Sequence, residues 1–416
     1  MLAEARAETA YGKGSISGRI ETKAPFALDM KAAVEGVAAE RKCSTEPEAA
    51  EETEPDHERA LGIRRGIRHG GGRDHARNWD RVAERLLDEF CIYAVDLRAP
   101  LTLVDSRIAY NRAQLDEAPS IDIGSTRLED WDRAQGLGGG AYVRNGRLRL
   151  VGSEFVENGA SVAGGGAALV GCKAIFEEND SNRCRFARNK ARVGGGLVLV
   201  GAPTAEATIK ATNIVVERNK AIVSGGGFAV IGCSIVQCVR GTFSENEIAD
   251  GLGHGGAVAC HVGAELLAAG VEFVDNKTSG YGGALAAIDA RLVIKDGARI
   301  RGNMARVSGG GVYCVTTNDP VAAELVRAKT IKLPLSVTLE NTKISNNASS
   351  ELGGGLRAGN EIGRPTLPLG IRIAEDVVFQ LNRTKSQLEH GDDVWVVWAG
   401  QVKATDRDRP PKIVLR

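Results

Sequence analysis

The sequence predicts an all-β fold, a parallel β-helix of about eight to nine turns, from two observations. First, an apolar residue is followed three positions later by an asparagine, and a glycine pair or triplet follows five to nine residues after that. These copies begin 27 to 44 residues apart, a spacing typical of stacked repeats. Second, the residues after each glycine group alternate as in strands that turn one face to a shared interior. The apolar and asparagine positions are Phe155/Asn158, Phe186/Asn189, Val216/Asn219, Phe243/Asn246, Phe273/Asn276, Ile300/Asn303 and Ile344/Asn347.

The N-terminal part of the chain differs from the repeats. Residues 1–74 are predicted to be largely disordered, because an acidic run over 45–57 precedes a basic, glycine-rich run over 63–77 and few apolar residues are spaced for a core. Residues 75–97 are predicted to form a helix over 78–91 and then a first strand. The apolar residues of this helix have helical spacing, so we expect it to cap the open end of the stack.

The predicted β-helix occupies residues 98–399 and is followed by a tail over 400–416. Its first copy, ending at Asn111, is degenerate, because a polar insertion over 112–135 delays the glycines. The last copy ends at Asn382 and lacks the glycine triplet. One copy is therefore expected to form one turn of the coil.

Each residue type in the repeat has a physical role. The aromatic or aliphatic residue is expected to point inward, and the glycines are expected to form a corner with positive φ. Asparagine tolerates left-handed backbone conformations, and its amide is able to bond to copies above and below. The sequence therefore predicts a structural ladder of seven asparagines: Asn158, Asn189, Asn219, Asn246, Asn276, Asn303 and Asn347.

The strand after each glycine group predicts an apolar outer face. We take the first and third residues after the glycines as inward-facing, beginning at Ala257 and Ala284 in the two copies with a glycine pair. The second and fourth residues then face outward and are also apolar in the middle copies. We expect this ridge to bind a partner or a second copy of the chain, or to be covered by the chain's own insertion or N-terminal segment. It comprises Val170, Val198, Val200, Ile231, Val258 and Leu285.

The alternating tetrapeptides resemble the repeats of the chlamydial polymorphic outer membrane proteins. They read Gly255-Gly256-Ala257-Val258 and Gly282-Gly283-Ala284-Leu285, with Phe243/Asn246 and Phe273/Asn276 between glycine groups. The resemblance implies a right-handed β-helix of the pectin-lyase-like class, and it implies display or adhesion at the cell surface or outside the cell. The first residues lack the basic-then-apolar pattern of a secretory signal, so an intracellular location stays open.

Composition narrows the partner classes. The chain has 53 basic and 53 acidic residues, so we expect no nucleic-acid partner, and it has no long apolar stretch that predicts a transmembrane segment. We expect no metal and no cofactor. The eight cysteines include no CxxC pair and are read as small buried hydrophobes. Disulfides between Cys184 and Cys238 or between Cys233 and Cys260 stay open.

Two functions are compatible with this scaffold. The first is a non-catalytic module that binds a protein or glycan partner, and the alternative is a polysaccharide lyase or glycoside hydrolase. An enzyme would place charged side chains on the outer face of neighbouring turns. The candidates for such a site are His254, His261 and Asp289, whereas Asp392 and Asp393 are expected to end the last turn. Because the outward positions of the middle copies are apolar, the sequence favours the non-catalytic scaffold.

Overall fold

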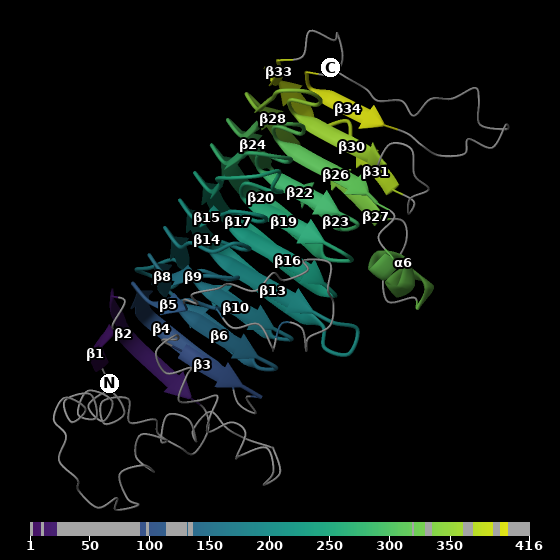
Figure 1. The fold of residues 1–416 in the computed structure, drawn as a ribbon. Coiled ribbons are helices and arrows are strands. Elements are labelled where there is room, and N and C mark those ends of the chain that lie inside the picture. The colour runs from purple at the N-terminus through teal and green to yellow at the C-terminus, as the bar shows by residue number, and fades with distance from the viewer. Residues whose placement is uncertain are drawn as a thin grey trace, which may run out of the picture.

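In the computed structural model the chain forms an all-β, solenoid-like fold whose strands stack in parallel ladders (Figure 1). Successive turns add strands to the same sheets, so the backbone groups of each turn are paired with those of the next. The structure describes residues 3–9, 12–22, 92–96, 100–113, 131, 136–317, 320–328, 335–360, 369–385 and 392–397.

The largest sheet has 16 strands. Its main path is β1 (Ala3–Thr9), β2 (Gly12–Thr22), β4 (Leu101–Ala109), β7 (Arg147–Val151), β11 (Lys173–Glu177), β14 (Ala207–Glu217), β17 (Ser234–Ser244), β20 (Glu265–Val274), β23 (Arg291–Lys295), β27 (Leu335–Leu339) and β31 (Leu369–Ile373). The shorter strands beside this path are β8 (Glu154–Val156), β12 (Arg185–Ala187), β24 (Ala298–Arg301), β28 (Thr342–Ser345) and β32 (Val378–Gln380).

A second sheet has ten strands and a third has six. The ten-stranded sheet comprises β3 (Ile92–Val95), β6 (Ala141–Arg144), β10 (Ala167–Val170), β13 (Leu197–Gly201), β16 (Phe228–Gly232), β19 (Val258–His261), β22 (Leu285–Ile288), β26 (Val312–Thr316), β30 (Leu356–Asn360) and β34 (Val394–Val397). The six-stranded sheet comprises β15 (Lys220–Ala221), β18 (Glu247–Ile248), β21 (Lys277–Thr278), β25 (Met304–Ala305), β29 (Ala348–Ser349) and β33 (Arg383–Thr384), and β5 (Arg112–Ala113) pairs with β9 (Gly159–Ala160).

An antiparallel hairpin closes the N-terminal edge of the 16-stranded sheet. β1 pairs with β2, and β2 pairs with β4 of the first turn. These two strands lie within residues 1–74, which are predicted to be largely disordered, and the rest of that segment lies outside the described residues. Small and charged residues alternate in Ala-Glu-Ala-Arg-Ala-Glu, which has the period of a strand but little apolar content. The helix predicted over 78–91 and the tail over 400–416 lie outside the described residues.

Inward side chains stack in a column along the coil. Phe155 and Phe186 pair in register with their rings 5.0 Å apart and nearly parallel. Val216 interrupts the stack of rings, and Phe228 of the ten-stranded sheet contacts the rings on either side of it, Phe186 and Phe243, edge-on at 5.5 and 5.3 Å. The repeat therefore builds one continuous core. The buried members of this column are Ile108, Phe155, Phe186, Val216, Phe243, Phe273, Ile300 and Ile344.

The third position of each glycine group sets the start of the next strand. The backbone N–H of Gly227 donates to the carbonyl of Ala257 at 3.0 Å, and that of Ala257 donates to Ala284 at 2.9 Å. Ala257 and Ala284 thus stand where other copies have a third glycine. The prediction that these alanines begin the inward column is wrong by one residue, and Val258 and Leu285 begin it instead.

The helix α6 (Pro320–Arg327) follows β26 at one side of the stack (Figure 1). Ala322 and Leu325 are buried on one side of this helix and belong to the main hydrophobic core. This segment adds a helix between β26 and β27 and accounts for the long step, 44 residues, from Ile300 to Ile344.

Candidate functional site

The predicted asparagines form a buried hydrogen-bonded ladder. The backbone N–H and the Nδ2 of each asparagine donate to the Oδ1 of the asparagine one turn further on. Asn219, for example, donates to Asn246 at 3.1 and 3.0 Å. Each Nδ2 also donates to a backbone carbonyl, as Asn246 does to Val216 at 2.9 Å. The seven predicted members, all buried, are Asn158, Asn189, Asn219, Asn246, Asn276, Asn303 and Asn347.

Two further asparagines and one carboxylate complete the ladder. Asn111 begins it by donating to Asn158, and Asn382 accepts from Asn347 at the other end. The Nδ2 of Asn382 donates to the carboxylate of Asp393 at 2.7 Å. All the side-chain amides point in one direction, so this carboxylate stands at the positive end of the aligned dipoles. The ladder is a structural element, and Asp393 accepts its last side-chain hydrogen bond.

The predicted interaction ridge does not form a free outer face. Val170, Val198, Val200 and Ile231 are fully buried in a cluster with Trp131, which comes from the insertion after β5. The interpretation of these four residues as a binding surface is therefore wrong, because the chain itself covers them. Trp131 is itself fully buried. The sequence left this alternative open, but it contains no pattern that pairs the insertion with these strands.

The other two ridge residues face the opposite way. Val258 and Leu285 belong to the main core inside the coil. Their assignment as binding residues is also wrong, because the alanine in the third glycine position shifts the strand by one residue and exchanges its two faces. Their neighbours Ala259 and Ala286 take the outward positions instead.

The structure brings two of the three candidate catalytic residues together. The rings of His254 and His261 are 5.9 Å apart, and the Oγ of buried Ser224 is hydrogen-bonded to Nε2 of His261 at 2.6 Å. Burial lowers the pKa of His254 to about 4, and burial together with the neighbouring His254 lowers the pKa of His261 to about 3. Both imidazoles are therefore neutral near pH 7.

Asp289 has a different role. Its Oδ1 accepts the backbone N–H of Thr317 at 2.8 Å, and its Oδ2 accepts the hydroxyl of the same residue. Asp289 has a positive φ of 51° and is fully buried at the end of β22. The carboxylate thus fixes the chain after β26.

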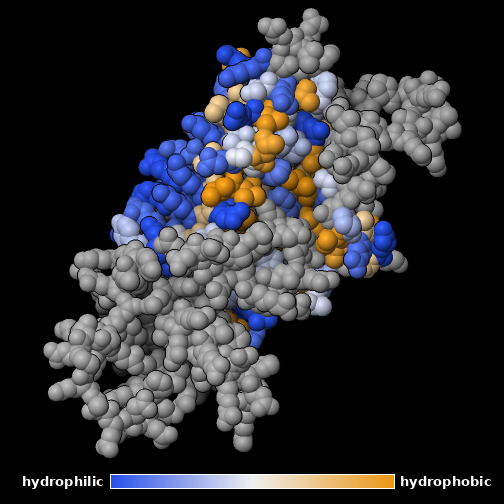
Figure 2. Space-filling model, viewed as in Figure 1, coloured by the Kyte–Doolittle hydropathy of each residue, from blue (hydrophilic) through white to orange (hydrophobic). Residues whose placement is uncertain are grey.

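Aromatic residues continue from the histidine pair along the outer face of the ten-stranded sheet. The ring of Tyr281 stacks on His254 at 5.6 Å, and Tyr313 lies 4.8 Å from Tyr281. The guanidinium of Arg357 lies over the ring of Tyr313, 4.9 Å from its centroid. In Figure 2, hydrophobic residues gather over this sheet in the centre of the view and hydrophilic residues along the left side. The outer face of this sheet is thus apolar and covered over β10, β13 and β16, and it becomes aromatic and polar from β19 to β30.

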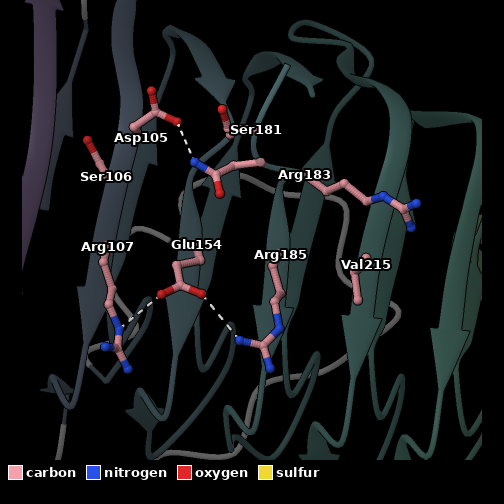
Figure 3. A pocket seen from close by; sticks show the side chains of 10 residues that line it. Asp105, Ser106, Arg107, Glu154, Ser181, Arg183, Arg185 and Val215 are labelled. Atoms are coloured by element: carbon pink, nitrogen blue, oxygen red, sulfur yellow. Dashed lines mark hydrogen bonds and ion pairs between the residues drawn. The ribbon is translucent and has the colours of Figure 1, made fainter. Parts of the chain in front are cut away.

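A polar groove of about 540 Å³ lies on the outer face of the 16-stranded sheet, near its N-terminal end (Figure 3). Arg107 of β4, Glu154 of β8 and Arg185 of β12 stand side by side in register. The carboxylate of Glu154 contacts Arg107 at 3.0 Å and Arg185 at 3.2 Å. Groove-lining residues are Asp105, Ser106, Arg107, Gly152, Glu154, Ser181, Asn182, Arg183, Arg185 and Val215.

One wall of the groove is the segment between β11 and β12. The Oδ1 of Asp105 accepts from Nδ2 of Asn179 at 2.7 Å and from Nδ2 of Asn182 at 2.9 Å. The Oδ1 of Asn179 in turn accepts the backbone N–H groups of Ser181 and Asn182. These bonds join residues more than 70 positions apart and hold the wall against β4.

The charges in the groove are unequally compensated. Glu154 is shared by two arginines, and Arg185 also pairs with Glu217. Arg183 is exposed, lies on the Val215 side of the groove in Figure 3, and has no ion pair with another described residue. The groove is therefore lined by the guanidinium of Arg183 on one side and by the carboxylate of Asp105 on the other, groups able to bind an anion and hydroxyl groups respectively.

Sequence reasoning missed this groove. A signal was present: the residue before the inward apolar position is Arg107, Glu154 and Arg185 in three successive copies, so opposite charges meet across neighbouring turns. The contact between Asp105 and the wall depends on the length of the segment between β11 and β12, which no repeat pattern specifies.

The described cysteines are free thiols, so neither of the two disulfides left open is formed. Five of them are buried, as predicted, and Cys233 is half-buried. Burial raises the pKa of Cys172 and of Cys238 to about 12. These thiols are therefore structural.

Comparison with protein-family models, with curated proteins and with solved structures gave no match. Within the described ranges, no helix is long and apolar enough to cross a membrane, and no group of three or more His, Cys, Asp or Glu side chains is placed to hold a metal ion.

Proposed function

We propose that this chain is a right-handed parallel β-helix that acts as a non-catalytic binding scaffold for an acidic glycan, displayed at the cell surface. The handedness and the location rest on the resemblance of the glycine and Phe-x-x-Asn tetrapeptides to polymorphic outer membrane protein repeats. The parallel stacking of the sheets and the asparagine ladder are compatible with such a coil.

The groove of Figure 3 is the observation that carries the proposal. Arginine forks bind carboxylates with two donors, and planar amides and carboxylates bind pairs of sugar hydroxyls. Arg183 has no ion pair with another described residue, and one oxygen of Asp105 is held by two amides while the carboxylate lines the groove. A uronate, which has one carboxylate and several hydroxyls, fits this set.

The same geometry supports binding rather than catalysis. The carboxylate of Glu154 is held in ion pairs with Arg107 and Arg185. Ser224, which is hydrogen-bonded to His261 of the histidine pair, is fully buried. The candidate acids and nucleophiles are thus engaged in contacts that hold the fold.

Isothermal titration with a galacturonic acid oligomer tests the proposal, with a neutral glucan oligomer as the parallel probe. We expect the acidic oligomer alone to bind, and Arg183→Gln to weaken its binding at least about tenfold. The matched control is Arg372→Gln, because Arg372 is a 74% exposed side chain on β31, remote from the groove, with a single 3.5 Å ion pair.

Three results would contradict the proposal. Equal affinity for the two oligomers would remove the role of the carboxylate, and unchanged affinity in Arg183→Gln would place the site elsewhere. Shortened oligomers after incubation would favour the alternative, a polysaccharide lyase or glycoside hydrolase.

A further inference from the structure

A second feature, on the opposite sheet, is a buried arginine without a counter-ion. Arg357 of β30 is only 7% exposed, and its Nη1 is fully buried without a hydrogen-bond partner. No ion pair joins it to a carboxylate in the part of the chain that the structure describes. Its guanidinium lies over the ring of Tyr313, and Arg357 is in register with Trp395 of β34.

A guanidinium in this state lacks sufficient compensation. Burying a charge is costly unless it is paired and hydrogen-bonded, and a cation–π contact offsets only part of the lost hydration. Arg185, which is partly exposed, is by contrast paired with Glu154 and Glu217. Among the described residues Arg357 has no counter-ion, and a bound anion would supply one.

The outward position next to Arg357 on β30 carries no side chain. Arg357 faces outward between the inward residues Leu356 and Ala358, and the next outward position is Gly359, which is buried. At the same position the preceding turns carry side chains, namely Val170, Val200, Ile231, His261, Ile288 and Val315.

Access to the site follows the aromatic residues. Tyr313 and Tyr281 are half-buried, and their rings lie 4.8 Å apart. The approach is flanked by neutral rings, and the carboxylate of Asp289 is turned to Thr317. No described carboxylate thus competes with an entering anion.

We propose that Arg357, supported by Tyr313, binds an oxyanion group on the outer face of the ten-stranded sheet. The ligand chemistry is that of a sulfate, phosphate or carboxylate group, each of which supplies the paired acceptor oxygens that a guanidinium fork requires. This site is separate from the groove and does not depend on the proposed glycan function.

Equilibrium dialysis with labelled sulfate tests the site, with phosphate and acetate as competitors at constant ionic strength. The parent protein is expected to bind sulfate, and Arg357→Gln to bind it at least about tenfold more weakly. Arg183→Gln is the control, because it removes the free cation of the groove and leaves Arg357 unchanged. Competition by phosphate alone would assign a tetrahedral anion, and competition by acetate as well would include carboxylates.

The measurement decides the proposal even where a variant folds poorly. Absence of sulfate binding by the parent protein would overturn it without reference to any variant. Loss of binding in Arg183→Gln but not in Arg357→Gln would assign the anion to the groove and also overturn it. Arg357→Lys, which keeps the charge and removes the fork, is expected to bind sulfate more weakly than the parent, and unchanged binding in this variant would contradict recognition by the fork.

Discussion

The asparagine ladder gives a quantitative test of how the coil is held together. In Asn246→Ala, the backbone N–H of Asn219 loses its acceptor and the carbonyl of Val216 loses the donor from Nδ2. Both groups are in the buried ladder, where leaving a polar group unsatisfied costs about 1–3 kcal/mol. Two such losses predict a destabilisation of about 2–6 kcal/mol.

Urea denaturation followed by circular dichroism measures this change, with Lys210→Ala as the control. Lys210 is exposed on β14, so its replacement is expected to stay within about 0.5 kcal/mol. Asn246→Asp adds a second comparison, because a carboxylate accepts from Asn219 but has no donor for Val216 and meets the Oδ1 of Asn276. This variant should be destabilised at pH 7, and the effect should shrink as acid protonates the carboxylate. An Asn246→Ala midpoint equal to that of Lys210→Ala would refute the reasoning.

Three further changes test the core, the covered outer face and the buried histidines. Phe243→Ala removes a ring stacked within the core and should destabilise by about 3–5 kcal/mol in the same urea assay. Val200→Lys combined with Ile231→Lys should abolish the cooperative transition, because both residues are buried with the tryptophan of the insertion; a native melting curve would show that this face is free. The pKa values of His254 and His261 in the folded state lie below the ordinary value of about 6.5, so protons bind preferentially to the unfolded chain. Their contribution is present above about pH 6.5 and is lost as the pH falls toward their folded pKa values of about 4 and 3. Melting curves between about pH 6.5 and 5 should therefore fall less steeply for the double glutamine variant than for the parent, and parallel curves would contradict the burial of the imidazoles.

The interior of the fold follows from local sequence. The apolar residue and the asparagine recur in every copy, so their columns are fixed by a pattern within four residues, as Phe243 and Asn246 illustrate. The outer face is less predictable, because its status depends on what the insertions cover. Trp131 lies far from Val200 in sequence, and no repeat relates them. The strand start at Val258 was misplaced for a simpler reason: an alanine takes the place of a glycine.

The candidate site was harder to predict than the fold. Arg107, Glu154 and Arg185 meet because three turns are in register, which becomes evident only when the copies are aligned on their apolar positions. Asp105 of β4 is hydrogen-bonded to the segment between β11 and β12, and Arg183 belongs to that segment. The repeat does not include this segment. The sequence suggested the histidine pair, because both residues belong to one turn of the stack. The carboxylate of Asp289 instead accepts a hydrogen bond from Thr317, and no pattern in the sequence predicts this contact.

A crystal structure of the chain soaked with a galacturonic acid oligomer would decide between glycan binding and glycan cleavage, because it reports both occupancy and bond integrity. We expect an intact oligomer in the groove, with a carboxylate on Arg183 and hydroxyls on Asp105. An empty groove at a concentration that saturates binding in solution, or an oligomer cleaved between its sugar rings, would exclude a non-catalytic glycan site in the groove.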